Sequence, residues 1–296
     1  MPAKQYLSEC KEFIDQSIGQ FLPGQKTFPE SIHESMHYSV FAGGKRLRPA
    51  LLIAAAEAVG GDRNEVLPFA VAVEFLHTYT LIHDDLPALD NDNLRRGKPT
   101  NHKVFGEAIA ILSGDGLLTQ SFILMTQAVM MENIPHKNIL RAANELARAL
   151  GSTGVIGGQV VDLESEGEAI DADTLEYIHI YKTGFFFKAC IRAGAILSQA
   201  SEVELGALSR FGAHIGLAFQ IIDDILDITG DQEKLGKDVG SDQDKDKATY
   251  PAMFGLEASK AKAEQLVEEG IACLDTFDHR ADPLRGIGQF FVERTF

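Results

Sequence analysis

Apolar residues recur at intervals of three and four along almost the whole chain, and this spacing constrains the fold more than any other sequence feature. It first appears in Tyr6, Cys10, Phe13, Ile14, Ile18 and Phe21. Such intervals place side chains on one face of an α-helix, whereas a half-buried strand alternates with a period of two. No alternating run of convincing length is present. We therefore predict an all-α fold, a bundle of roughly ten or more helices.

Proline and glycine divide this helical pattern into segments, because both interrupt helices. The expected helices cover residues 6–21, 29–41, 49–59, 62–85, 104–131, 137–150, 153–164, a segment beginning at Asp173, 202–228, 251–277 and 283–292, with a loop over 234–250. The interruptions are short and evenly spread, so residues 1–296 are expected to form a single domain. Gly114 and Gly116 lie inside one expected helix, which suggests that a neighbouring element packs closely there.

The balance of charges argues against two classes of partner. The 296 residues include 27 Lys and Arg against 43 Asp and Glu, a net charge of −16. Such an acidic surface repels nucleic acid and anionic lipid, so neither is expected to bind. No stretch of about 18 apolar residues is free of charge, so no membrane span is expected. The first 21 residues carry several charges and do not resemble a secretion signal.

Three cysteines, Cys10, Cys190 and Cys273, bear on the cellular compartment. Their number is odd, their spacing is wide and no CxxC pair is present. Neither a disulfide framework nor a zinc site is therefore expected, and all three are predicted to be small buried residues. This usage fits a reducing cytosol, so a cytoplasmic location is expected.

A dense group of charges follows the most apolar part of the chain. The stretch from Glu74 to Thr100 reads EFLHTYTLIHDDLPALDNDNLRRGKPT. Its acids offer the hard oxygen ligands that Mg²⁺ and Ca²⁺ prefer, and Arg95 and Arg96 offer guanidinium groups that match phosphate oxygens. Together, at the end of an apolar helix, they indicate a site for a metal-bound phosphate ester with an apolar body.

This first acidic cluster cannot lie on one face of a straight helix. Asp84 and Asp90 are six residues apart, and Pro87, which breaks helical hydrogen bonding, lies between them. We expect the helix to end or distort over residues 85–89, so that Asp84, Asp85 and Asp90 converge.

A second acidic cluster, QIIDDILD over residues 220–227, has helical spacing. Asp223 and Asp227 are four apart and share one helix face, where two like charges repel by about 0.2–0.5 kcal/mol. The neighbouring residues are apolar, and carboxylates in such surroundings need a partner, which a divalent cation would supply. Either cluster alone could be a solvated helix end. The two together favour metal binding.

These motifs in combination resemble those of the trans-prenyl diphosphate synthases. The resemblance rests on DDxxxxD at 84–90 with LRRGKPT after it, DDxxD at 223–227, GGKRLRP at 43–49, YKTG at 181–184, FQ at 219–220, GK at 236–237 and KATYP at 247–251. It covers nearly the whole chain and is strongest for the bacterial farnesyl diphosphate synthases. It implies the isoprenoid synthase fold, in which the helices surround a deep apolar cavity.

The resemblance implies that the chain joins an allylic diphosphate to isopentenyl diphosphate. The implied cofactor is Mg²⁺, three ions per site, with Mn²⁺ as a possible substitute. The ions would stabilise charge on the departing diphosphate as Lewis acids. The implied metal residues are Asp84, Asp85, Asp90, Asp223, Asp224 and Asp227. Of these, Asp85 and Asp224 are the least certain ligands, because they could instead hold basic residues or metal-bound water.

The other implied site residues hold the two diphosphates and the allylic cation. The allylic diphosphate is assigned to Arg95, Lys182, Lys237 and Lys247. Isopentenyl diphosphate is assigned to Lys45, Arg48, His77 and Arg96. Stabilisation of the cation is assigned to carbonyl dipoles near Lys182 and Thr183 and to the amide oxygen of Gln220, in an apolar cavity that excludes water.

Several of these residues have simpler interpretations when taken singly. Lys45 and Arg48, with Arg46 between them, could form a solvated basic turn. His77, on an apolar helix, could bond a backbone carbonyl, and the Thr183 hydroxyl could bond back to its own helix.

Tyr79 and Thr80 precede Asp84 by five and four residues and bear on product length. Five helical residues span about 7.5 Å, so a ring at Tyr79 would form the floor of the product cavity. In the resembling family an aromatic residue here goes with a C15 product, farnesyl diphosphate, made from dimethylallyl and geranyl diphosphate. Tyr79 could also be an ordinary core residue. The stretch DNDNLRRGKPTNHKVFGE also resembles geranylgeranyl diphosphate synthases, so a C20 product stays open.

Two other classes compete with this interpretation. A terpene cyclase would not need the basic set assigned to isopentenyl diphosphate. A non-catalytic partner subunit or binding protein would be indicated by damaged acidic motifs, and both motifs are intact here. The resemblance finally implies a homodimer.

Overall fold

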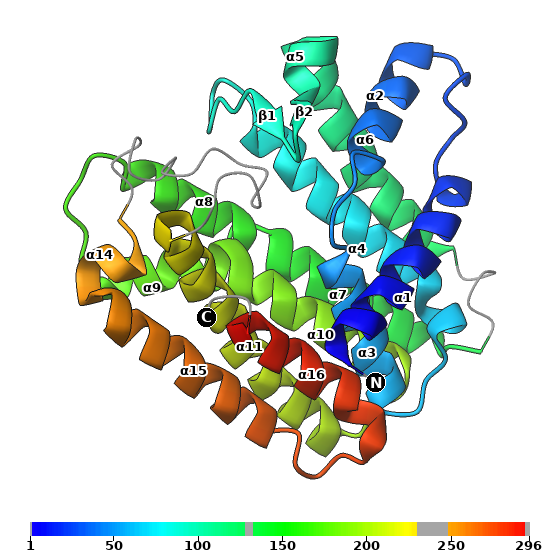
Figure 1. The fold of residues 1–296 in the computed structure, drawn as a ribbon. Coiled ribbons are helices and arrows are strands. Elements are labelled where there is room, and N and C mark those ends of the chain that lie inside the picture. Colours follow the sequence, from blue (N-terminus) through cyan, green and yellow to red (C-terminus); the bar gives the residue numbers. More distant parts are fainter. Residues whose placement is uncertain (1, 128–132, 230–247, 294–296) are drawn as a thin grey trace.

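The computed structural model describes residues 2–127, 133–229 and 248–293 (Figure 1). Its helices are α1 (Ala3–Ser17), η1 (Ile18–Phe21), α2 (Glu30–Val40), α3 (Leu47–Ala58), α4 (Arg63–Asp84), α5 (Asn101–Phe105), α6 (Glu107–Thr126), α7 (His136–Leu150), α8 (Val155–Glu164), α9 (Ala172–Ile178), η3 (His179–Gly184), α10 (Phe185–Leu197), α11 (Glu202–Thr229), α14 (Tyr250–Phe254), α15 (Leu256–Ala272), η4 (His279–Ala281) and α16 (Asp282–Glu293). Most of the predicted 234–250 loop, with Lys237 and Lys247, lies outside the described residues.

The all-α prediction is confirmed. In the described ranges the only strands are β1 (Leu94–Arg95) and β2 (Lys98–Pro99), which form an antiparallel hairpin with Arg95 opposite Lys98. Strands this short leave no alternating pattern in the sequence. The two turn residues, Arg96 and Gly97, have φ of 55° and 75°, as a tight two-residue hairpin turn requires.

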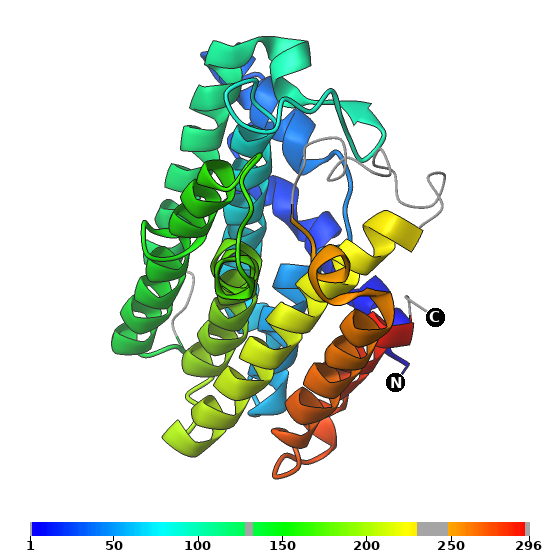
Figure 2. The same cartoon turned by 90° about the vertical axis from the view of Figure 1, so that its left-hand side faces the viewer.

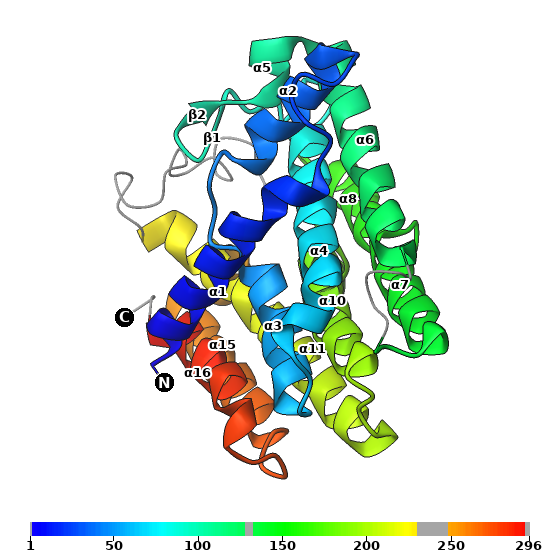
Figure 3. The ribbon, with the colours of Figure 1, turned by 90° about the vertical axis from the view of Figure 1, so that its right-hand side faces the viewer.

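The interior is built around long helices that run beside one another (Figures 2 and 3). Helix α4 packs on α6 and α3, α10 packs on α3, α7 and α11, and α11 packs on α15. Buried hydrophobic residues from Tyr6 to Phe291 form one cluster. The single domain stays a prediction. Helices α1 and α16 lie side by side, with Lys4 Nζ 5.7 Å from the ring centroid of Phe290 (Figure 3).

The close packing predicted at Gly114 and Gly116 is confirmed, and the neighbours are helices α4 and α2. A Cβ on Gly114 would lie 2.1 Å from His83 Nε2, and one on Gly116 would lie 3.1 Å from Met36 Sδ. His83 Nε2 also lies 3.0 Å from the carbonyl oxygen of Ile111. The missing side chains therefore let α6 approach α4 and α2.

Some expected boundaries are wrong because a glycine divides the segment. Gly106 and Gly255, both with φ of 83°, separate α5 from α6 and α14 from α15. The helix expected from Asp173 is instead α9, the π-helical segment η3 and α10 in succession. Cys10 and Cys190 are buried as predicted, but Cys273 is partly exposed, and all three are free thiols.

By length and composition alone, three of the described helices could cross a membrane. In the most apolar window of each, 72% of α4 and 61% of α11 are buried inside the molecule, against 39% of α6. The absence of a membrane span stays a prediction. Helix α6 differs from the other two because less than half of its window is buried and four of its large apolar residues are exposed.

Candidate active site

The first acidic motif lies where α4 ends. The backbone N–H of Asp90 donates to the carbonyl oxygen of Asp84 at 2.8 Å, and that of Asn91 donates to Leu86 at 3.0 Å. Residues 85–90 form turns rather than helix. The predicted distortion over residues 85–89 is thus confirmed, and it brings the backbone of Asp90 against the last helical residue.

The middle acid of this motif, Asp85, holds an arginine of the hairpin. Its Oδ1 accepts hydrogen bonds from Arg95 Nε, at 2.9 Å, and from Arg95 Nη2, which also donates to Asp92 at 3.0 Å. Asp85 is 3% exposed. Burial raises the pKa of Asp85 to about 6, although the bonds from Arg95 act in the opposite direction. Asp85 therefore positions Arg95.

The middle acid of the second motif is held by residues of two neighbouring elements. Asp224, on α11, is 5% exposed. Its Oδ2 accepts from the backbone N–H of Tyr250, at 2.8 Å, and lies 3.2 Å from Nε2 of the buried His179. The rings of His179 and Tyr250 stack at 6.1 Å. Asp224 therefore joins α11 to η3 and α14.

The outer acids, Asp84, Asp90, Asp223 and Asp227, differ from the middle pair because each is partly exposed. In the described part of the chain, no three Asp, Glu, His or Cys side chains form a group that could hold a metal. The predicted convergence of Asp84, Asp85 and Asp90 is therefore not confirmed, since Asp85 faces Arg95. The outer acids do offer the oxygen donors that Mg²⁺ prefers, so the donor chemistry fits that ion.

A cavity of about 540 Å³ brings together residues that are distant in the sequence. The predicted site residues that line this cavity are Lys45, Arg48, His77, Arg95, Arg96, Thr183, Gln220 and Asp223. All four residues assigned to isopentenyl diphosphate are in this set. They share the cavity with residues assigned to the allylic substrate, the cation and the metal.

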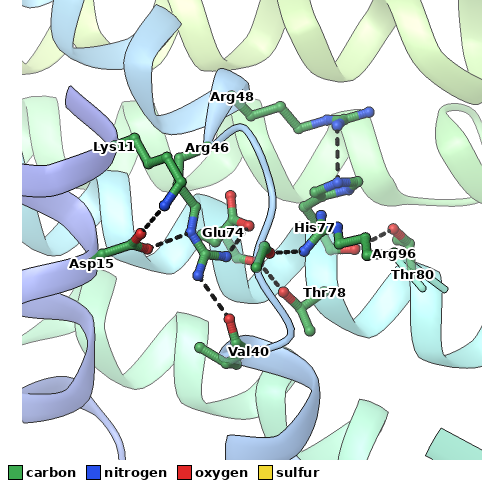
Figure 4. Close-up of polar contacts among 11 residues, drawn as sticks. Lys11, Asp15, Val40, Arg46, Arg48, Glu74, His77, Thr78, Thr80 and Arg96 are labelled. Atoms are coloured by element: carbon green, nitrogen blue, oxygen red, sulfur yellow. Dashed lines mark hydrogen bonds and ion pairs between the residues drawn. The ribbon is translucent and has the colours of Figure 1, made fainter. Parts of the chain in front are cut away.

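Arg48 and His77 form a direct contact inside this cavity (Figure 4). Arg48 Nη1 lies 3.2 Å from His77 Nε2. Because an arginine can only donate, Nε2 must accept, which leaves a neutral imidazole with its proton on Nδ1. A neutral imidazole is also expected from its surroundings, because desolvation and the charges of Arg48 and Arg96 hold the pKa of His77 well below its ordinary value.

The guanidinium of Arg48 also has an unmatched donor. It lies 4.9 Å and 5.3 Å from the ring centroids of Phe187 and Phe186, and its buried Nε has no hydrogen-bond partner within the described residues. Desolvation lowers the pKa of Arg48. A buried cationic donor of this kind fits an anionic ligand.

Arg96 reaches the same cavity because Gly44 lacks a side chain. Its Nη1 donates to the carbonyl oxygen of Gly43. A Cβ on Gly44, which has φ of +129°, would lie 2.6 Å from the Arg96 guanidinium. The glycine pair before Lys45 thus gives Arg96 its place.

A smaller cavity of about 110 Å³ adjoins the second motif and includes Lys182, His179 and Asp224. Thr183 and Gln220 line both cavities and so lie between them. Lys182 Nζ donates to Asp162 Oδ2 at 2.6 Å. The three residues of this cavity that are assigned to the cation or the allylic diphosphate come from η3 (Lys182 and Thr183) and α11 (Gln220), whereas Arg95, on β1, lines the larger cavity.

Two close backbone approaches place the π-helical segment. A Cβ on Gly158 of α8 would lie 2.3 Å from the backbone nitrogen of Lys182, and one on Gly216 of α11 would lie 2.7 Å from Cα of Gly184. Single π-helical turns occur often at functional sites. Here the wider turn carries Lys182 and Thr183.

The predicted cavity floor is not part of either cavity. Tyr79 is 7% exposed, and its ring meets that of His83 edge-on at 5.8 Å. Thr80 Oγ1 donates to the carbonyl oxygen of His77 at 2.8 Å. Neither side chain lines the 540 Å³ cavity. Their role in product length stays a prediction.

Sequence reasoning missed Asp162, His179 and the buried pair of Arg46 and Glu74. Asp162 and His179 lie on different elements from the residues they contact, so no local spacing marks them. A weak signal existed for Arg46, which is the middle of three basic residues in KRLR and has the same type as Arg48.

Comparison with known proteins agrees with this geometry. The polyprenyl synthetase family model matches residues 29–279. A farnesyl diphosphate synthase from Geobacillus stearothermophilus is 49% identical over 262 residues, 88% of each chain. A geranylgeranyl diphosphate synthase from Cyanophora paradoxa is 46% identical over 291 residues, 98% of this chain and 95% of the relative.

The fold comparison gives the same family. A crystal structure of an FPP/GFPP synthase from Zymomonas mobilis superposes with a TM-score of 0.86 at 36% identity and covers 98% of both chains. With matches of this extent in sequence and in fold, the chain belongs to the polyprenyl synthetase family and is a prenyl diphosphate synthase.

Proposed function

We propose that this chain makes farnesyl diphosphate by condensing isopentenyl diphosphate with dimethylallyl and then geranyl diphosphate. The observation that carries the proposal is the 540 Å³ cavity, in which basic residues suited to one diphosphate adjoin an acidic motif suited to another. A terpene cyclase needs an acidic motif but does not need the basic residues for a second diphosphate. The intact acidic motifs argue against a non-catalytic subunit.

The proposed metal is Mg²⁺, with Mn²⁺ as a substitute because it also accepts carboxylate oxygens. Asp84, Asp90, Asp223 and Asp227 would hold it. When bound, it would supply Lewis-acid stabilisation of the departing diphosphate. The middle acids act differently in this scheme. Asp85 presents Arg95 to the allylic diphosphate, and Asp224 holds η3, which carries Lys182.

The rest of the reaction depends on this chain's own residues. Arg48 would donate its unmatched Nε–H to the isopentenyl diphosphate, with Lys45 and Arg96 beside it. Thr183 and Gln220, between the two cavities, supply dipoles near the allylic carbon. Apolar residues on the cavity wall, among them Leu47, Leu81 and Phe219, would exclude water from the cation.

The C15 product rests on the aromatic ring of Tyr79, five residues before Asp84. A C20 product is the alternative, because relatives of similar identity are named geranylgeranyl diphosphate synthases. The test is incubation with isopentenyl and dimethylallyl diphosphates and Mg²⁺, followed by sizing of the products. Mostly C15 product supports the proposal, mostly C20 product supports the alternative, and no condensation contradicts both.

We further propose that two copies of the chain associate through α6. The support is its outward apolar surface, since Ile111, Leu112, Phe122 and Ile123 are 44%, 51%, 36% and 41% exposed. Figures 2 and 3 place α6 at the edge of the molecule. Light scattering should give the mass of a dimer, and Leu112→Glu should shift it towards the monomer. A monomeric wild-type chain would contradict the proposal.

A further inference from the structure

Arg46 lies in the sequence between Lys45 and Arg48, which are assigned to isopentenyl diphosphate, yet its guanidinium is bonded to oxygens of the protein (Figure 4). Nε donates to Asp15 Oδ1 at 2.8 Å, Nη1 to Glu74 Oε1 at 2.6 Å and Nη2 to the carbonyl oxygen of Val40 at 2.8 Å. The residue is 3% exposed. One side chain thus ties α1, α4 and the end of α2 to the start of α3.

Glu74 is the partner that makes this arrangement obligatory. It is 1% exposed, and its second oxygen, Oε2, is buried without a hydrogen-bond partner among the residues described. A carboxylate so placed depends on the opposite charge beside it, because an unpaired buried charge is strongly destabilising. Arg46 and Glu74 therefore form one unit.

The backbone of Arg46 is as constrained as its side chain. Gly43, Gly44 and Arg46 have φ of 99°, 129° and 49°, so the chain bends through left-handed conformations before α3 begins. A residue with a side chain rarely adopts such a conformation without support. The carbonyl oxygen of Arg46 then accepts from the N–H of Ala50 at 3.0 Å, in the first turn of α3.

Two parallel contacts fix this bend on α4. Glu74 and His77 are three residues apart, so they lie one helical turn from each other on a single face. Glu74 Oε1 accepts a hydrogen bond from Arg46 Nη1. One turn further along α4, His77 Nε2 accepts from Arg48 Nη1 at 3.2 Å (Figure 4). The place at which Arg48, on α3, meets α4 therefore follows from the place at which Arg46 does.

We propose that Arg46 is a positioning residue that sets the geometry of Lys45 and Arg48, and thereby the affinity for isopentenyl diphosphate. Arg46 lines the 540 Å³ cavity, but it is 3% exposed and each of its three nitrogens donates to a protein oxygen, so we expect its effect to be exerted through its two neighbours. The inference rests on the proposed function, because it assumes that Lys45 and Arg48 bind this substrate.

The test replaces the buried pair as a unit, in the double variant Arg46→Met with Glu74→Met. Such a swap leaves the net charge of the cavity unchanged and is often neutral for stability. The melting temperature should therefore stay close to that of the wild type. The KM for isopentenyl diphosphate should rise about tenfold or more, because small displacements of binding groups are costly. The KM for geranyl diphosphate should change by less than about twofold, since the allylic side is untouched.

Two further variants guard this test. Arg46→Lys supplies one point of charge in place of a three-way fork, so a smaller rise in the KM for isopentenyl diphosphate is expected. It also provides the readout if the double variant does not fold. Asp15→Asn is the matched control, because it changes the half-exposed end of the network and leaves Glu74 in place, and both KM values should stay near those of the wild type.

Calorimetric titration of the wild type with isopentenyl diphosphate separates the two proposals. If the wild type neither binds nor condenses this substrate, the proposed function fails. If it does, but Arg46→Lys and the folded double variant bind isopentenyl diphosphate as tightly as the wild type, the role of Arg46 is wrong. A rise in both KM values to the same extent would also overturn it.

Discussion

The two acidic motifs look alike in sequence but are built differently. The first lies in the turns after α4, and its middle acid is held by Arg95, ten residues further along the chain. The second lies within the regular helix α11, and its middle acid is held by η3 and by Tyr250, 26 residues later. In each motif the middle acid is buried and the outer acids are partly exposed. The outer and middle acids therefore differ in their surroundings, and the middle acid is held by a nearby residue in the first motif and by distant ones in the second.

The largest effects are expected from the outer acids, one in each motif. Asp84→Ala and Asp223→Ala should each lower kcat by about a thousandfold or more. Each removes a carboxylate that would hold the metal, and the metal would stabilise the charge that develops on the departing diphosphate in the transition state. The loss should be similar for both, despite the different backbones. Steady-state assays with Mg²⁺ measure kcat, and thermal unfolding should show little change.

Asp173→Ala, which removes an exposed aspartate in the first turn of α9, is the control for these variants. Its kcat should match the wild type. Full turnover by either outer-acid variant would show that its motif does not hold the metal.

The middle acids should separate binding from stability. Asp224→Ala leaves the buried N–H of Tyr250 without its acceptor, which costs about 1–3 kcal/mol of unfolding free energy. Asp85→Ala should cost less, because Arg95 keeps Asp92 and is 20% exposed. Instead, Asp85→Ala should raise the KM for the allylic diphosphate about tenfold through a misplaced Arg95.

Chemical denaturation and KM measurements on both variants test this contrast. Equal losses of stability would mean that the middle acids do not differ as their contacts indicate. An unchanged allylic KM in Asp85→Ala would remove Arg95 from the allylic site.

Product length should depend on α4, which leads into the first motif, and not on α11, which carries the second. Tyr79→Ala should lengthen the product beyond C15, with total turnover changed by less than about tenfold, because no group at the reacting carbon is lost. Phe219 on α11, which contacts Phe187 and Phe291, is the matched aromatic residue. Phe219→Ala should leave the product at C15. Chromatographic sizing decides, and an unchanged product in Tyr79→Ala would place the floor elsewhere.

Much of the fold and part of the site could be predicted because local signals determine them. Helical spacing predicted the bundle, Pro87 predicted the distortion after Asp84, and the glycines of α6 predicted its close packing. The remainder depends on contacts between distant elements. His179 reaches Asp224 from another helix. Arg46 and Arg48 both line the cavity, and only the structure shows that Arg46 is buried with its nitrogens bonded to protein oxygens whereas Arg48 Nε has no partner within the described residues. A π-helical turn has no periodicity that a short sequence reveals.

The smallest effect is expected at His179, whose contact with Asp224 is the long-range feature of the second motif. Because an ionised carboxylate only accepts, Nε2 of His179 carries the proton there, and its buried Nδ1 has no partner within the described ranges. His179→Gln places an amide N–H near the position of Nε2 and removes the unmatched nitrogen, so turnover should stay within about threefold of the wild type and stability should hardly change. His179→Leu, which lacks a donor, should lower both. If the two variants behave alike, the contact is only packing, and Tyr250 alone provides the long-range support of Asp224.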